Sequence, residues 1–145
     1  MWIDERGSEV LPLAECRRLL AVAAKHHHHG HLGIPTDDAP VVLPLDFGVN
    51  GDDVVVRVGD GLSGRMIGRL VAFQVDNSSA GPEWSAGGPE GRWSVLVRGP
   101  ALEVDPAAAD GLPEPRVAEP GNRVVRVRGD VVTGRRLRSP DDGHR

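Results

Sequence analysis

The most regular pattern in the chain is an alternation of apolar and polar positions between residues 40 and 76. Apolar side chains occupy every second position over residues 41–49 and again over residues 54–58, and the Asn50-Gly51 pair stands between the two runs. A period of two is typical of a strand with one buried face, and Asn-Gly favours a tight hairpin turn. The pattern predicts a β-hairpin, a glycine-rich turn at residues 59–64 and another strand over residues 71–76.

Shorter runs of the same kind predict further strands at residues 31–34, 92–104 and 123–128. The run at 92–104 is interrupted by Gly99-Pro100. The run at 41–49 contains Pro44, which has no backbone N–H and so indicates an edge strand or a bulge. Six short strands predict a mainly β domain, an antiparallel barrel or sandwich.

One amphipathic helix is predicted in front of these strands, from Pro12 to about Lys25. Proline is well placed at the start of a helix, because its missing N–H would have no partner there. The expected buried stripe has three- and four-residue spacing. It consists of Leu13, Cys16, Leu19, Leu20, Ala23 and Ala24. A second helical segment, of at most one turn, is predicted at residues 65–68.

Length and composition limit the domain count, the partners and the compartment. A chain of 145 residues fits a single domain, here residues 1–145, with an N-terminal arm at 1–11, a mobile loop at 77–90 and a disordered tail at 138–145. The net charge of -4 argues against general binding to nucleic acid or to an anionic membrane. No apolar run approaches the roughly 20 residues that span a bilayer. The single cysteine, Cys16, excludes an internal disulfide and fits the reducing cytoplasm.

The glycine-rich turn GDGLSG, residues 59–64, is the candidate for binding a phosphate. Glycines let backbone N–H groups approach an anion, Ser63 offers a hydroxyl, and Arg57 and Arg65 offer charge-assisted hydrogen bonds. The alternative is an ordinary turn with solvated arginines, because the P-loop and dinucleotide-binding patterns are both missing. No nucleophilic triad is recognisable by motif, so a bound cofactor would supply any chemistry.

Histidines gather at His26–His29 and His31. Neighbouring imidazoles can chelate a transition metal, but a specific site needs ligands that converge from separate elements. We expect a solvated helix end and turn here, and no metal site. Cys16 lies on the expected buried stripe of the helix, so we interpret it as a packing residue and not as a nucleophile.

Several stretches, taken together and in order, resemble the flavin-binding split-barrel family related to pyridoxamine 5'-phosphate oxidase, closest to its small nitroimidazole-reductase-like branch. The stretches are SEVLPLAECRRLL, HGHLGI, PVVLPLDFGVNGDDVVVRVGDG, GRLVAFQVD, WSVLVRG and RVVRVRGDVVTGRRL. The resemblance implies a six-stranded Greek-key split barrel, a homodimer, and FMN bound in a groove between the subunits.

The resemblance also implies the residues of the site. The strand with Val42, Leu43, Pro44 and Leu45 would lie along the isoalloxazine ring. The phosphate would be held by the segment with Arg57, Val58, Gly61, Leu62, Ser63 and Arg65. Trp93 and Ser94 would reach the flavin of the other subunit. Apart from the resemblance, we also expect Arg135 and Arg136 of a second copy to contribute to this half of the site. Many relatives have a Thr-Lys or Ser-Arg-Lys sequence that binds the phosphate after the glycine turn, where this chain has Leu62-Ser63-Gly64.

These expectations favour a flavin-dependent oxidoreductase with an unknown small-molecule substrate. Deazaflavin in place of FMN, or no flavin at all, are the alternatives for the cofactor. From a different class, the same barrel can serve as a non-catalytic binding or sensor module for haem, deazaflavin or another small ligand. Metal handling by the histidine tract is a third hypothesis.

Overall fold

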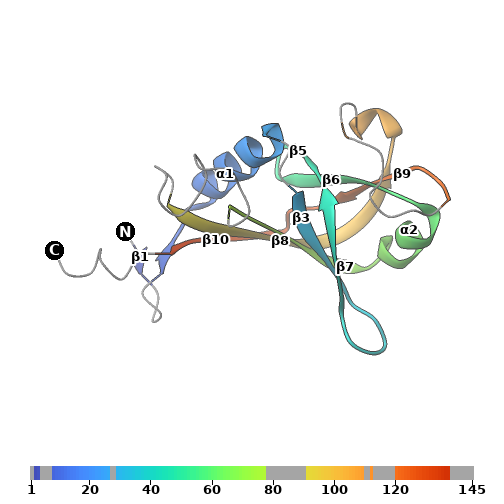
Figure 1. Ribbon diagram of the computed structural model, residues 1–145, viewed down its shortest axis with the longest axis horizontal. Helices are drawn as coiled ribbons and strands as arrows, with labels where there is room; N and C mark the ends of the chain where they lie inside the picture. Colours follow the sequence, from blue (N-terminus) through green and yellow to red (C-terminus); the bar gives the residue numbers. More distant parts are fainter. Residues whose placement is uncertain are drawn as a thin grey trace.

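A computed structural model describes residues 2–3, 8–26, 29–77, 91–109, 112 and 120–137 of the chain. Within these residues ten antiparallel strands form one strongly curled sheet, with two α-helices and a short 3-10 helix around it (Figure 1). The elements are β1 (Trp2–Ile3), β2 (Glu9–Val10), α1 (Leu13–Lys25), β3 (His29–Ile34), β4 (Val41–Asp46), β5 (Gly48–Asn50), β6 (Asp53–Val58), α2 (Asp60–Met66), β7 (Leu70–Asp76), β8 (Arg92–Val104), η2 (Pro106–Ala109), β9 (Arg123–Val127) and β10 (Val131–Leu137). The loop and the tail predicted at residues 77–90 and 138–145 lie almost entirely outside the described residues.

The strands curl into a barrel through a series of pairings that is closed where the chain continues from β4 into β5. β4 pairs with β3 and continues, after Phe47, into β5, which pairs with β6. From there the ring runs through β9, β8 and β7 and returns to β3. The six strands predicted from the alternation make up this ring, with β4 and β5 as one bent strand. The mainly β, split-barrel fold class is therefore confirmed, although the number of strands is larger than six.

The barrel splits along β8. Residues 92–98 of β8 pair with β10, whereas residues 101–104 pair with β9. The change of partner falls at Gly99-Pro100, where the backbone N–H of Arg128 donates to the carbonyl of Pro100 over 3.0 Å. β10, β2 and β1 extend the sheet beyond the ring on this side (Figure 1).

Side chains from every strand of the ring fill its interior. The predicted inward faces are confirmed for the strands at 54–58, 71–76, 92–98 and 123–127, whose alternate residues are buried in one cluster. On the outside of β6 and β9, Val55 and Val124 form a second, smaller cluster with Val104 and Leu112. Pro44 is exposed on β4, which ends the path of paired strands, as expected for an edge strand.

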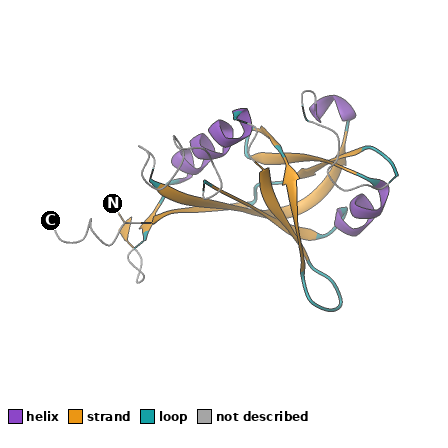
Figure 2. Ribbon diagram, in the orientation of Figure 1, coloured by secondary structure: helices purple, strands orange, loops and turns teal. Residues whose placement is uncertain are grey.

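α1 covers the part of the sheet where β8 and β10 leave the ring (Figure 2). Cys16, Leu19, Leu20 and Ala23 are buried as predicted and Ala24 is partly buried, whereas Leu13, the first residue of the helix, is 45% exposed. None of the helices in the described part of the chain is long and apolar enough to cross a membrane.

Three local predictions were wrong. The hairpin turn is Gly51-Asp52, one residue later than expected, since Asn50 and Asp53 are paired. GDGLSG is the start of α2 and not a turn, because Leu62, Ser63 and Met66 bury one side of a two-turn helix.

β10 was not predicted as a strand at all. Its inward face carries Gly134, where α1 comes so close that a Cβ would lie 2.6 Å from the Cys16 sulfur.

Burial raises the pKa of the Cys16 thiol, and the nearby Glu15 carboxylate raises it further. A thiol with a raised pKa stays protonated in the folded state while the unfolded chain ionises, so its contribution to stability is lost as pH rises above the ordinary thiol value of about 8.5. We expect Cys16 to react with a thiol reagent only after unfolding, and urea unfolding to show a loss of stability between pH 8 and 10. Cys16→Ala should remove that pH dependence; an unchanged slope would contradict the assignment.

Candidate ligand-binding groove

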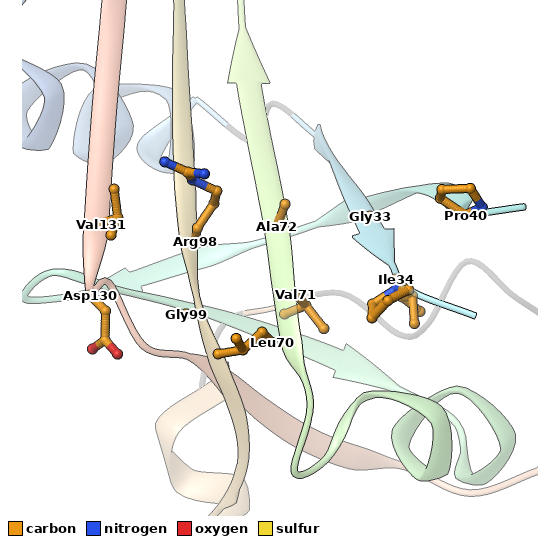
Figure 3. A pocket seen from close by; sticks show the side chains of 11 residues that line it. Gly33, Ile34, Pro40, Leu70, Val71, Ala72, Arg98, Gly99, Asp130 and Val131 are labelled. Atoms are coloured by element: carbon orange, nitrogen blue, oxygen red, sulfur yellow. The ribbon is translucent and has the colours of Figure 1, made fainter. Parts of the chain in front are cut away.

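A groove with a volume of about 660 Å³ lies on the outer face of the wall formed by β3, β7, β8 and β10 (Figure 3). It is lined by residues 33–35, 70–72, 98–99 and 130–131, together with Pro40. The size is within the usual range for small-molecule sites, and most of the lining is apolar. The strands that carry most of the lining are paired side by side.

Small residues face outward at the centre of the groove floor, so they leave space for a ligand above the sheet. Gly33 pairs with Ala72, and Ala72 pairs with Arg98, so that these three residues form one row across the strands. A Cβ at Gly33 would meet only ordinary van der Waals contacts with Ala72, at 3.8 Å. Gly33 therefore leaves room above the sheet without being required by the fold.

Two arginines stand at this groove without a carboxylate partner. Arg98 is exposed on the groove wall, and Arg69 donates from Nη1 to the carbonyl of Pro35, a lining residue, over 3.4 Å. Neither forms an ion pair with a described residue, whereas Arg17, Arg18, Arg123, Arg126, Arg128 and Arg136 each pair with a carboxylate. Uncompensated guanidinium groups beside an apolar floor suit a ligand with a flat apolar part and an anionic part.

The one carboxylate in the lining is already occupied. Asp130 accepts a hydrogen bond from Arg128 Nε over 2.7 Å, and this hydrogen bond and the charge of Arg128 lower the pKa of Asp130. Asp130 therefore remains ionised at neutral pH and is not set up as a proton donor. Among the described lining residues, no other carboxylate, histidine or cysteine is present.

A polar row of side chains adjoins the apolar row on the same outer face. His31 and Gln74 are paired across β3 and β7, two residues from Gly33 and Ala72 respectively. His31 Nδ1 lies 3.3 Å from Gln74 Oε1, and Gln74 Nε2 donates to Asp76 over 2.8 Å and to Ser94 over 3.1 Å. His29 contacts His31 edge to face, with ring centroids 5.5 Å apart.

The predicted site residues of β4 divide between the two faces of the sheet. Val42 and Pro44 are exposed on the outer face, and Val42 pairs with Gly33 of the groove floor. Leu43 and Leu45 point inward and pack in the core, so they can reach a ligand only through their backbone. The structure thus brings Val42 next to the groove.

The segment that was predicted to bind the phosphate, residues 57–65, lies outside the groove. Arg57 faces outward on β6, next to β9, on a different wall of the barrel from the groove. Val58 and Leu62 are buried in the core, and the Ser63 hydroxyl donates to the carbonyl of Asp60 within the same helix. Gly61 also lies within this helix, and Arg65 is exposed in its last turn.

Asp60, at the amino end of α2, has partners at the start of β9 and in the segment before it. The backbone N–H of Asp60 donates to the carbonyl of Pro120, and its carboxylate pairs with Arg123 over 2.8 Å. Within the glycine-rich segment, Leu62 and Ser63 are buried, and Gly61 and Gly64 are exposed.

The residues expected to reach a second subunit are also separated. Trp93 is 1% exposed and its ring is in the core, whereas Ser94 faces outward in the polar row. Arg135 is exposed opposite Ser94 on β10. Arg136 faces α1 instead, where it pairs with Glu9 at 3.8 Å and Glu15 at 3.3 Å.

Sequence reasoning did not select Arg69, Leu70 or Arg98 as site residues. A signal was present, because Leu70 and Ala72 are apolar at positions whose parity places them on the face expected to be polar. Val42 shows the same departure on β4. In the described part of the chain, no group of three or more histidine, cysteine or acidic side chains is placed to hold a metal ion.

A barrel split along one long strand, with a groove on its outer wall, defines the chain as a split-barrel protein. The family model described as pyridoxamine 5'-phosphate oxidase matches residues 12–136. The chain belongs to this family, as the resemblance implied. No curated protein sequence matches it.

Solved structures of similar proteins share this fold. The FAD-binding protein from Mycobacterium smegmatis is 28% identical, with a TM-score of 0.65 over 90% of this chain and 99% of that one. An FAD-binding protein from Mesorhizobium loti is 21% identical, with a TM-score of 0.64 over 90% of this chain and 99% of that one. The FAD and haem binding protein from Mycobacterium smegmatis is 14% identical, with a TM-score of 0.57 over 87% of this chain and 75% of that one.

Proposed function

We propose that this protein binds a flavin nucleotide, FMN or FAD, in the groove on the outer wall of β3, β7, β8 and β10, and works as a flavin-dependent oxidoreductase. The observation that carries the proposal is the pair of uncompensated arginines, Arg69 and Arg98, beside an apolar groove of about 660 Å³. A flavin nucleotide has a planar, largely apolar ring system and an anionic phosphate, which match these two features. The match of the family model and the FAD-binding proteins of the same fold support it.

The chemical types of the residues at the groove fit a flavin nucleotide. Gly33 and Ala72 would lie under the ring system, because their small side chains leave the sheet backbone accessible. Arg98 and Arg69 would hold the phosphate. A bound flavin supplies hydride and electron transfer, and the protein would supply position and electrostatics.

The proposal is tested by purifying the protein from cells supplied with riboflavin and recording its visible spectrum. We expect flavin absorption bands, or else saturable quenching when the apoprotein is titrated with FMN and FAD separately. Because the solved structures of the same fold include FAD-binding proteins, the ratio of the two affinities identifies the nucleotide. A protein that binds neither flavin would overturn the proposal. One that binds flavin but passes no electrons from NADH or NADPH to any acceptor would be a binding or sensor module.

We further propose that the protein is a homodimer in which a second copy covers the groove. Leu70 is 71% exposed, Val42 is 63% exposed and Val131 is 43% exposed, and all three lie on the groove wall or beside it. Large exposed apolar residues on one sheet face are typical of an interface between chains. A second copy on this face would also remove water from a ligand in the groove.

The dimer makes a direct prediction for Leu70. Leu70→Glu places a charge at the most exposed apolar residue of this face, and a charge that the second copy would bury without a partner is costly. We expect the variant to be monomeric by light scattering at concentrations where the parent chain is dimeric, with an unchanged far-ultraviolet circular dichroism spectrum. Leu13→Glu is the matched control, because Leu13 is also exposed but lies on α1. A monomeric parent chain, or two variants with equal effects, would contradict the proposed interface.

A further inference from the structure

The imidazole of His31 is held by a chain of hydrogen bonds that leads away from the groove. Asp76, as a carboxylate, can only accept hydrogen bonds, so the group of Gln74 that faces it at 2.8 Å is the amide NH₂. The other end of the same amide, its carbonyl oxygen, therefore faces His31 Nδ1 at 3.3 Å. A carbonyl oxygen accepts, so Nδ1 of His31 must carry the hydrogen.

This arrangement fixes the tautomer of the neutral imidazole. With the hydrogen on Nδ1, the other ring nitrogen, Nε2, has a free lone pair and acts as an acceptor. Ser94 supports the arrangement because it accepts the second N–H of Gln74 over 3.1 Å. Three strands, β3, β7 and β8, thus contribute to orienting one ring.

His31 stands at the rim of the groove. It lies on the same outer face of β3 as Gly33, two residues away, and alternate residues of a strand are separated by about 7 Å. In the adjacent strand Gln74 has the same relation to Ala72. The apolar lining of the groove offers few hydrogen-bonding side chains, so a ligand that extends along β3 meets His31 as its first neutral acceptor.

We propose that His31 is a ligand-recognition residue whose Nε2 accepts a hydrogen bond from the imide N–H of a flavin ring in the groove, and that Gln74 and Asp76 are positioning residues that set its tautomer. This inference rests on the proposed function, since it concerns the orientation of the flavin. It goes beyond that function by stating which edge of the ring system points toward β3. The ring would then extend from the arginines toward the polar row.

The tautomer is measured without any flavin, by long-range ¹H–¹⁵N correlation NMR of the histidine rings in the apoprotein. We expect His31 to show a protonated Nδ1 and an unprotonated Nε2. Gln74→Leu should release the ring from this single tautomer. A wild-type protein with the hydrogen of neutral His31 on Nε2 would overturn the proposal.

Binding is measured with FMN and with N3-methyl FMN, which lacks the imide N–H. The parent chain should bind FMN more tightly than the methylated analogue, and His31→Phe should bind FMN about 3- to 10-fold more weakly and lose the discrimination. His29→Phe, on the same face, is the matched control and should keep it. If the parent chain binds neither flavin, the proposed function fails and this role fails with it. If it binds FMN and His31→Phe discriminates equally well, only the role of His31 is overturned.

Discussion

Gly99→Ala is expected to destabilise the protein by about 3 kcal/mol or more, among the largest effects of any single methyl group in this chain. The Cβ of an alanine would overlap the backbone carbonyl of Arg128, and its next contact would be the Asp130 N–H at 3.4 Å. A backbone carbonyl cannot move aside as a flexible side chain can, because Arg128 is also bonded to Pro100 at the same crossing. The strand connection between β9 and β10 would have to shift away from β8.

Urea unfolding followed by circular dichroism measures this loss. Gly33→Ala is the matched control, since Gly33 lies in the same sheet, two strands away from Gly99, and its added methyl group would meet Ala72 only at 3.8 Å. We expect the control to unfold with nearly the parent midpoint. Equal midpoints for Gly99→Ala and Gly33→Ala would show that the crossing has more freedom than the structure gives it.

Arg98→Ala is expected to weaken the binding of FMN or FAD by about 10- to 100-fold, the usual range for the loss of one charge-assisted hydrogen bond to phosphate. The variant should leave the fold unchanged, because the side chain is exposed and forms no ion pair with a described residue. Fluorescence titration with FMN, and in parallel with riboflavin, separates a phosphate contact from a ring contact. The affinity for riboflavin should change little.

Two other arginines provide controls for Arg98→Ala. Arg92 lies on the same strand and the same outer face, at the far end from the groove, and Arg57 lies on a different wall of the barrel. Both alanine variants should bind FMN like the parent chain. A large loss with Arg57→Ala and none with Arg98→Ala would return the phosphate to the glycine-rich segment and refute the groove as its site.

The ring of strands could be predicted from the sequence because its physical cause is local. Each strand buries alternate residues in the same interior. Apolar residues therefore recur at every second position in residues 41–49, 54–58 and 92–98. β10 lacks that signature for a reason that only the packing shows. Its covered face meets a helix at close range, which calls for Gly134, and it carries an ion pair from Arg136 to Glu15 in place of an apolar residue.

The groove could not be predicted because it depends on register. Arg57, Arg92 and Arg98 are all outward-facing arginines on strands, and nothing in their sequence neighbours distinguishes them. Only the pairing of Arg98 with Ala72 and Val131 places it beside an apolar wall. The glycine-rich segment was wrongly predicted as a turn, since a short helix with two glycines has little intrinsic helix propensity and depends on burial of Leu62 and Met66.

The sharing of β8 among β7, β9 and β10 has a consequence for how the chain folds. During synthesis β3, β4, β6 and β7 emerge before β8, so the second edge of β7 has no strand to pair with until residues 92–104 have left the ribosome. Most pairings in the ring join strands that are far apart in the sequence, and such topologies fold in milliseconds to seconds and not in microseconds. Until β8 is available, one edge of β7 stays unpaired in the nascent chain. The pairing of β8 with β7 covers that edge.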